Sequence, residues 1–375
     1  MIESFDYNKL QLRLITKAEK RTSPIKAMFE LTYRCNLKCR HCYVVPPKDE
    51  ERGTKELTTK EVFLILDQLA AAGCLNLGFT GGEPFLRNDI FDILRYAKTK
   101  GFNIIVLTNG TLITPKKADS LKELGLNKID ISFHASDKEI FDWFTKTPGT
   151  YKKVLNAVKL LRDRGIEVYF KATAMTINRY DMLKMRHFAV EKFGAHFRWG
   201  PVVTPSWDGR KENLKFRLSV QEASQLRKEI QKDTEIEFEK LDALKKKNRR
   251  PKNKKRRERK IDHSRLFRCG AGSTEAVINP YGEMKLCMDM PEPKYQILKG
   301  SFTEGWRVLS DYVRNTPPGP TYQCRDCELS QYCNFCPAMG WLECGDASAC
   351  PPYYREMTRT VKAETEKIVE RRGKR

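Results

Sequence analysis

Strand-like and helix-like stretches alternate from residue 28 to residue 202, and this alternation restricts the fold of the chain more than any other feature. Short apolar runs are typical of buried strands, and longer amphipathic stretches are typical of helices. Six such units predict an α/β fold with a parallel sheet, because right-handed crossovers place the helices on one outer surface. The predicted strands are residues 28–33, 75–80, 103–108, 128–134, 167–176 and 196–202, and the predicted helices are residues 58–72, 89–100, 115–124, 151–164 and 180–193.

Three cysteines follow the first predicted strand at the spacing C-x3-C-x2-C, namely Cys35, Cys39 and Cys42. A loop this short can turn three sulfurs toward one point, and soft thiolates suit zinc or an iron–sulfur cluster. A structural zinc site is closed by four ligands, and the nearby sequence lacks a fourth. A cubane held by three cysteines instead leaves one iron open, which we favour over a purely redox or structural trio of thiols.

Glycine and polar residues follow the next strands at their carboxyl ends, where the active sites of β/α barrels lie. Gly81, Gly82, Glu83 and Pro84 come directly after the second strand, where paired glycines expose backbone groups and the glutamate adds an acceptor. Thr108-Asn109-Gly110 ends the third strand, and residues 132–136 end the fourth. An ordinary turn is the alternative explanation for each segment.

The cysteine loop, with His41 before its last cysteine, and the Gly-Gly-Glu-Pro turn resemble those of radical S-adenosylmethionine (SAM) enzymes. The resemblance implies a partial (β/α)6 TIM-like barrel. It also implies that Cys35, Cys39 and Cys42 hold a 4Fe–4S cluster whose open iron is chelated by the amino and carboxylate groups of SAM. Reductive cleavage of SAM in that family gives a 5′-deoxyadenosyl radical.

The same resemblance implies a set of cofactor contacts. His41 and the backbone of Tyr43 would lie beside the adenine, and the Gly-Gly-Glu-Pro turn would meet the methionine ammonium. The implied cofactor-binding residues are His41, Tyr43, Gly81, Gly82, Glu83, Pro84, Asn109, Ser132, Thr173 and Asn178. His134 departs from the aspartate common near its position, and it is either a satisfied turn histidine or a proton-transfer group on the substrate side.

A second set of cysteines lies in the last third of the chain. Cys269 and Cys287 flank a predicted hairpin, residues 275–278 and 283–287, and a C-x2-C-x5-C-x2-C run begins at Cys324. Alone, the run is also compatible with a zinc ribbon. With the first half of the chain it resembles the SPASM extension of radical SAM enzymes, which holds auxiliary 4Fe–4S clusters. The resemblance implies a first auxiliary cluster on Cys269, Cys287 and Cys336, and a second on Cys324, Cys327, Cys333 and Cys350.

Two features depart from the SPASM pattern. Only two residues separate Cys333 from Cys336, where the family more often has three. Both Cys344 and Cys350 stand where the late ligand is expected, so either can fill that place. If Cys350 does, Cys344 is either the fourth ligand of the first auxiliary cluster or a catalytic thiol that donates a hydrogen atom. We expect Cys74 to be a buried packing residue.

These patterns divide the chain into five regions. The predicted regions are an N-terminal extension (1–27), the radical SAM partial barrel (28–213), a helical and basic linker (214–265), the SPASM auxiliary-cluster domain (266–351), and a C-terminal helix with a basic tail (352–375). We expect the C-terminal helix to pack on the barrel.

The net charge of the 375-residue chain is +22, and residues 245–260 contribute twelve Lys and Arg against one Glu. Such a run is either a solvated segment or a docking patch for an acidic peptide or a nucleic acid. It lacks interleaved aromatics, which disfavours nucleic acid. The sequence shows neither a signal peptide nor an apolar stretch of membrane-spanning length, so we expect a cytoplasmic protein without a membrane partner. In that compartment we expect the cysteines to bind metals rather than to form disulfides.

The expected function is peptide modification by a radical SAM maturase that uses SAM and three 4Fe–4S clusters. The expected partners are a peptide or protein substrate, an acidic one if the basic run docks it, and an electron donor such as ferredoxin or flavodoxin. If the substrate carries a leader, either a separate leader-peptide-recognition protein or the barrel surface reads it. A small-molecule substrate such as a haem precursor is the alternative. Formylglycine-type sulfatase maturation is a second alternative, disfavoured because Met288 stands where that subgroup has aspartate and Asp289 is one residue off. A nucleic-acid-binding protein is the alternative from a different class.

Overall fold

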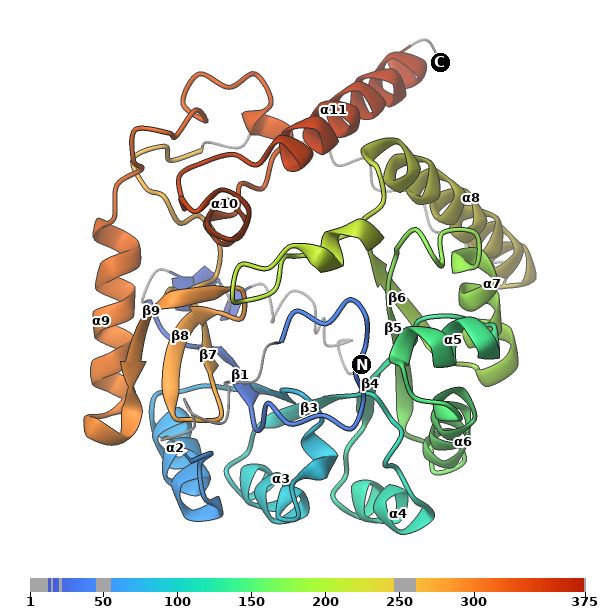
Figure 1. The fold of residues 1–375 in the computed structure, drawn as a ribbon, viewed down its shortest axis with the longest axis vertical. Coiled ribbons are helices and arrows are strands. Elements are labelled where there is room, and N and C mark those ends of the chain that lie inside the picture. The colour runs from blue at the N-terminus through green and yellow to red at the C-terminus, as the bar shows by residue number, and fades with distance from the viewer. Residues whose placement is uncertain (1–12, 15, 20–21, 45–54, 246–260, 374–375) are drawn as a thin grey trace, which may run out of the picture.

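A single curved sheet forms the centre of the computed structural model, which describes residues 13–14, 16–19, 22–44, 55–245 and 261–373 (Figure 1). Its strand order is β6-β5-β4-β3-β2-β1-β7-β8-β9. Strands β1 to β6 pair in chain order and are all parallel, which confirms the predicted partial barrel. These strands are β1 (Lys26–Glu30), β2 (Asn76–Thr80), β3 (Asn103–Thr108), β4 (Lys128–Ser132), β5 (Glu167–Thr173) and β6 (His196–Gly200).

Helices cover the outer surface of this sheet (Figure 1). Their ends follow local signals in the sequence: Thr58 and Glu61 form a capping box at the start of α2, and Thr114 caps α4, whose first residue is Pro115. The helices of the barrel are α2 (Thr59–Ala71), α3 (Ile90–Thr99), α4 (Pro115–Glu123), α5 (Lys138–Thr145), α6 (Thr150–Arg162) and α7 (Met182–His187). The π-helical segment Phe188–Lys192 continues α7.

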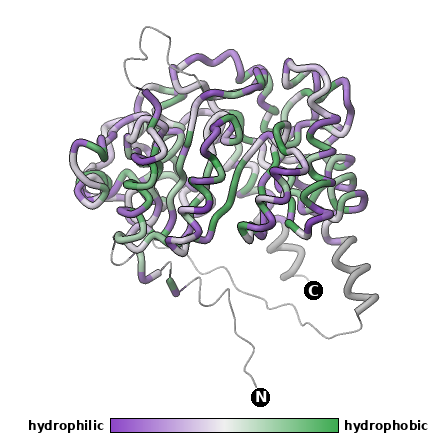
Figure 2. Tube along the Cα trace, turned by 90° about the horizontal axis from the view of Figure 1, so that it is seen from below, coloured by the Kyte–Doolittle hydropathy of each residue, from purple (hydrophilic) through white to green (hydrophobic). Residues whose placement is uncertain are grey.

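The core lies between the sheet and these helices. Phe29, Phe79, Phe133 and Phe170 stand on or directly after four different strands and are fully buried. Figure 2 shows apolar segments running through the middle of the molecule, while hydrophilic segments are concentrated along its outline. Burial of these apolar side chains therefore determines which face of each strand packs against the helices, and polar side chains occupy the opposite face.

The predicted hairpin is present, and it extends the barrel sheet instead of forming a separate one. Strand β7 (Glu275–Ile278) pairs in parallel with β1, and β8 (Glu283–Cys287) and β9 (Met290–Gln296) follow antiparallel. The hairpin turn ends at Gly282, whose φ of +78° favours glycine. The SPASM-like region therefore begins against the first barrel strand.

Several helices differ from the sequence prediction. Neither α5 nor α9 (Phe302–Asn315) nor α10 (Pro337–Cys344) was predicted. The C-terminal helix α11 (Pro352–Gly373) packs on α8 (Val220–Lys245). The side chains of Ser224 and Glu364 hydrogen-bond between the two helices, and Gln221 Nε2 donates to Glu356 Oε1 at 3.0 Å. Helix α11 therefore packs along α8, and Tyr354 near its start also packs against the main hydrophobic core, so the expected packing on the barrel stays a prediction.

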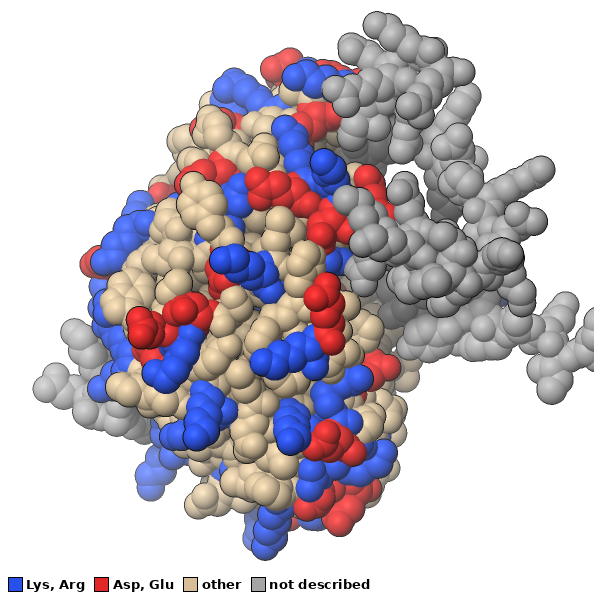
Figure 3. All heavy atoms as spheres, turned by 90° about the vertical axis from the view of Figure 1, so that its right-hand side faces the viewer, with Lys and Arg blue, Asp and Glu red and all other residues tan. Residues whose placement is uncertain are grey.

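Charge is mixed on the face that carries α5 to α8. Figure 3 shows Lys and Arg side chains interspersed there with Asp and Glu. Residues 246–260 of the basic run lie outside the described residues, so its role stays a prediction. None of the described helices is long and apolar enough to cross a membrane.

Candidate active site

A cavity of about 490 Å³, called the main cavity below because it contains the loop thiols, opens at the carboxyl ends of the barrel strands. The loop after β1 and the ends of β2 to β6 line it, and Met288 reaches it from the turn between β8 and β9. The predicted site residues that line this cavity are Cys35, Cys39, His41, Cys42, Tyr43, Gly81, Gly82, Asn109, Ser132 and Thr173. Segments separated by more than a hundred residues therefore meet at one place.

The three loop thiols interact with one another. Burial raises the pKa of all three, that of Cys39 to about 12, and the charges of Cys42 and Cys35 add to the shift at Cys39. A thiolate needs a compensating positive charge in such a place, and a bound metal supplies it. Asn109 Nδ2 also donates to Cys35 Sγ at 3.8 Å, which holds that thiol toward β3.

Helix α5 carries the middle of the cysteine loop. Phe144 and Thr145 are the last two residues of α5. The backbone N–H of Lys38 donates to Thr145 O at 3.2 Å, and the backbone N–H of Arg40 donates to Phe144 O at 3.1 Å. Arg40 also donates from Nε to the carbonyl of Trp143 at 3.1 Å and stacks on its ring. Because α5 was not predicted, the sequence did not reveal this support.

The glycine pair after β2 holds the start of the cysteine loop. Gly82 N donates to Thr32 O at 2.7 Å, and Glu83 N donates to Arg34 O at 2.9 Å. A Cβ on Gly81 would lie 2.2 Å from Thr32 O, and the φ of Gly81, +133°, also favours glycine. The paired glycines therefore serve close backbone packing as well as access to a ligand.

We expect Gly82→Ala to weaken cluster retention about 10- to 100-fold, the usual effect of disturbing groups that orient metal ligands. The new Cβ would lie 2.3 Å from Arg34 O and 2.8 Å from Tyr33 O, so the cysteine loop has to move. The measurement is iron loss from anaerobically reconstituted protein during chelator challenge. Gly200→Ala is the matched control, because a Cβ at that strand end meets no atom within 4 Å. Equal iron retention in both variants would contradict this role of Gly82.

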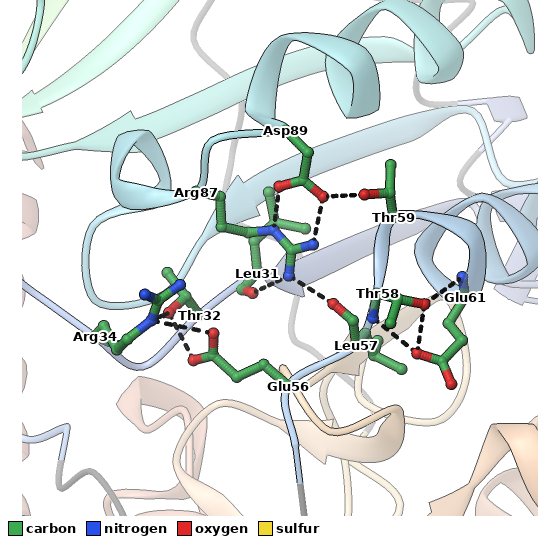
Figure 4. A network of polar contacts seen from close by, with 10 residues as sticks. All are labelled: Leu31, Thr32, Arg34, Glu56, Leu57, Thr58, Thr59, Glu61, Arg87 and Asp89. Atoms are coloured by element: carbon green, nitrogen blue, oxygen red, sulfur yellow. Dashed lines mark hydrogen bonds and ion pairs between the residues drawn. The ribbon is translucent and has the colours of Figure 1, made fainter.

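A polar network that the sequence analysis missed fixes the base of the loop (Figure 4). Buried Arg87 donates from Nη1 to Leu31 O at 3.2 Å and to Leu57 O at 2.9 Å, and its other nitrogens form a bidentate pair with Asp89. Glu56 accepts from Thr32 Oγ1 at 2.6 Å. In the sequence, Arg87 is marked only by its position three residues after Pro84 of the Gly-Gly-Glu-Pro turn. Its acceptors Leu31 and Leu57 are distant in sequence, so no local pattern predicted these contacts.

Three of the predicted cofactor-binding residues lie behind the cavity wall. The carboxylate of Glu83 is fully buried and accepts from Phe85 N, Thr108 Oγ1 and Asn109 N at 2.7 to 3.1 Å. Pro84 is also buried. Asn178 donates to His134 O and Thr173 O and accepts from Met175 N, so its amide braces the end of β5. None of the three is among the residues that line the cavity.

His41 and His134 form a buried imidazole pair at the cavity wall, with ring centroids 4.9 Å apart. Burial lowers the pKa of His41 to about 4 and lowers the pKa of His134 well below its ordinary value. Both rings are therefore neutral at neutral pH. Both Nδ1 atoms are buried and have no hydrogen-bond partner among the described residues, so each can serve a bound ligand.

Charge contributions to the pKa of Cys287 and of Cys350 come from two different sets of cysteines. Burial raises the pKa of Cys287 to about 12, with smaller contributions from Asp289, Cys336 and Cys269. Burial also raises the pKa of Cys350 to about 11, with contributions from Cys333, Cys324 and Cys327. A second cavity, of about 520 Å³, is lined by Cys269, Cys333 and Cys336 together with Arg265 and Arg268, so the two groups adjoin.

Cys344 belongs to neither group. It is exposed at the end of α10, its charged neighbours are Glu343, Lys211 and Asp346, and it does not line the main cavity. Cys74 is buried, as expected of a packing cysteine. Within the described ranges, no group of three His, Cys, Asp or Glu side chains is placed to hold a single metal ion.

A buried ion pair joins the barrel to the hairpin beside the site. Lys285 Nζ on β8 lies 3.3 Å from Glu30 Oε2 on β1, and the two residues are 5% and 2% exposed. Tyr33 Oη donates to the same carboxylate at 2.9 Å, and the ammonium lies over the ring of Trp207. Each buried charge thus has a partner, as buried charges require.

Comparisons with known proteins point to one family. Residues 29–189 match the family model described as "Radical SAM superfamily". The chain is 25% identical over 338 residues to the AdoMet-dependent heme synthase of Methanosarcina barkeri, covering 88% of this chain and 96% of that protein. It is 30% identical over 275 residues to the antilisterial bacteriocin subtilosin biosynthesis protein AlbA of Bacillus subtilis, covering 72% of this chain and 56% of AlbA.

The fold is shared with solved structures. The crystal structure of Streptococcus suis SuiB bound to its precursor peptide SuiA superposes with a TM-score of 0.66 at 16% identity. That superposition covers 93% of this chain and 81% of SuiB. At this level of identity, the likeness concerns the fold.

Proposed function

This chain is a radical SAM protein, with the domain of that superfamily at residues 29–189, and on this premise we propose that it modifies a peptide substrate. The cavity that gathers the three loop thiols, the glycine turn and Ser132 carries the radical SAM part of the proposal, and the similarity to AlbA and SuiB carries the choice of a peptide substrate. When bound, the cluster would supply the single electron for reductive cleavage of SAM, the chemistry that starts hydrogen abstraction from a substrate.

The residues at this cavity fit such a cofactor. Cys35, Cys39 and Cys42 would be the iron ligands, and three thiolates leave a fourth position for SAM. The unpaired Nδ1 atoms of His41 and His134 would serve the bound cofactor or substrate as hydrogen-bond groups. The exposed backbone of Gly81 and Gly82 would meet the methionine moiety, and the side chains of Ser132 and Thr173 would meet the ribose and carboxylate.

Glu83, Pro84 and Asn178 would act through other residues. The carboxylate of Glu83 binds Thr108 Oγ1 and Asn109 N, so it would fix the end of β3 beside Cys35. Asn178 would hold the end of β5 in the same way. These are positioning roles, which differ from the direct cofactor contacts expected from the sequence.

The auxiliary sites would take two further 4Fe–4S clusters. We assign Cys324, Cys327, Cys333 and Cys350 to one cluster, because Cys333 and Cys327 contribute to the raised pKa of both Cys324 and Cys350. We assign Cys269, Cys287 and Cys336 to the other, because Cys269 contributes to the raised pKa of both Cys287 and Cys336. Cys350 is then the late ligand. Cys344 is exposed and does not line the main cavity, so its position does not support a role as a cluster ligand or as a hydrogen-atom donor.

A peptide substrate is favoured by the known roles of two similar proteins. SuiB is solved with a precursor peptide, and AlbA is a bacteriocin biosynthesis protein. The similarity to an AdoMet-dependent heme synthase over most of both chains supports a haem precursor as the second candidate. For either substrate, an electron donor such as ferredoxin or flavodoxin would supply the reducing electron. A separate protein or the barrel surface would read any peptide leader.

The experiment that separates the two candidates is coexpression with a small peptide encoded beside the gene, followed by mass spectrometry. We expect a mass decrease of about two hydrogens for a crosslink or an oxidised residue, lost when Cys39 is replaced by alanine. Fe-coproporphyrin incubated with the reconstituted protein is the parallel assay. Conversion of the porphyrin with no change in the peptide would overturn the peptide assignment.

A further inference from the structure

Three charged side chains stand on the wall of the main cavity, on neighbouring strands. Among the described residues that line the cavity, the Asp, Glu, Lys and Arg side chains are Asp130 on β4, Lys171 on β5 and Arg198 on β6. The parallel register pairs Ser132 with Lys171 and Lys171 with Arg198. A hydroxyl, an ammonium and a guanidinium therefore stand in one row across three strands.

The two cations share one carboxylate, and neither is close to it. Lys171 Nζ lies 3.7 Å and Arg198 Nη1 lies 3.9 Å from Asp130 Oδ2, both beyond ordinary hydrogen-bond length. Asp130 is 4% exposed, whereas the side chains of Lys171 and Arg198 are 46% and 52% exposed. This part of the wall thus keeps a net positive charge, with donors turned to the open cavity.

The guanidinium is held in place by aromatic stacking. Arg198 lies over the ring of Tyr169, 4.1 Å from its centroid, and Tyr169 stacks on His196 with centroids 4.3 Å apart. A planar guanidinium fixed in this way presents paired N–H groups, which match the two oxygens of a carboxylate. The adjacent ammonium of Lys171 adds a second charge without a fixed geometry.

We propose that Lys171 and Arg198 form a subsite that binds a carboxylate group of the substrate, an acidic side chain or the C-terminus of a peptide. This inference rests on the proposed function and names its substrate class. The carboxylate of SAM is the other source of the same chemistry. Ser132 and Thr173, which we place at the ribose and carboxylate of SAM, stand on β4 and β5 beside Lys171, whereas Arg198 stands one strand farther along, on β6. The test below therefore separates the two sources.

The test measures the binding of a matched peptide pair to the full-length, anaerobically reconstituted protein at saturating SAM, without reductant. The probes are acetyl-Gly-Glu-Gly-amide and acetyl-Gly-Gln-Gly-amide, titrated calorimetrically. We expect the acidic peptide to bind about tenfold more tightly, as charge-assisted hydrogen bonds predict. In the Lys171→Gln/Arg198→Gln variant the two peptides should bind within about twofold of each other. Lys128→Gln is the matched control, because Lys128 lies near Asp130 but outside the main cavity, and it should keep the preference.

Equal binding of the two peptides to the parent protein would overturn the inference. It would also be overturned if the double variant kept the preference but lost affinity for SAM, because the cations would then serve the cofactor. If the double variant unfolds, Arg198→Gln alone decides the question, since its half-exposed side chain lies on an edge strand and should still reduce the preference. The assay reads binding alone, so its failure is distinct from a failure of peptide modification.

Discussion

Cys39→Ala should abolish the reductive cleavage of SAM to 5′-deoxyadenosine and remove about four irons per chain, the content of one 4Fe–4S cluster. Cys39 is the most shielded of the three loop thiols, and its raised pKa in the metal-free protein reflects burial and the neighbouring thiols. The remaining two thiols cannot hold a cubane, since three ligands already leave one iron open. The measurements are 5′-deoxyadenosine formed after dithionite reduction and iron bound after anaerobic reconstitution.

Cys74→Ala is the control for this experiment. Cys74 is buried and also has a raised pKa, but it lies before β2 and does not line the cavity. We expect this variant to keep both its iron and its SAM cleavage. Full cleavage by the Cys39 variant would remove the basis for the radical assignment, and an equal loss in the Cys74 variant would point to misfolding instead.

Lys285→Met should lower the free energy of unfolding by about 3–5 kcal/mol, because it leaves the Glu30 carboxylate buried without its cation. Burial already raises the pKa of Glu30, and Lys285 is the main group that opposes this shift. A buried acid with a raised pKa binds protons more readily in the folded state. The stability of the variant should therefore fall as the pH rises through that pKa. Denaturant unfolding of the cluster-free protein at several pH values measures both effects.

Two further variants test whether the loss of stability comes from the unpaired Glu30 carboxylate. Glu30→Gln/Lys285→Met should recover most of the loss, because the pair is removed together and the amide oxygen can still accept from Tyr33. Lys294→Met should cost less than about 1 kcal/mol, because its pair with Glu283 is half-exposed. A Lys285 variant no less stable than the Lys294 variant would show that the buried pair does not tie the hairpin to the barrel.

The sequence was informative wherever a signal is local. Alternating apolar runs placed β3 at residues 103–108 as the structure has it, and the other barrel strands within a few residues. The grouping of the later cysteines came from the resemblance to the SPASM extension, and it stays a prediction. A short ligand loop, a cap or a glycine turn is encoded within a few neighbouring residues, so these features can be read without the fold.

The tertiary structure alone decided how these local elements meet. The support of Lys38 and Arg40 by α5, the pairing of β7 with β1 and the entry of Met288 into the cavity each join segments far apart in the chain. The same holds for the cationic row of Lys171 and Arg198, whose residues look like ordinary exposed strand positions in the sequence. Strand register and side-chain packing create these contacts, and no local pattern of residue types specifies them.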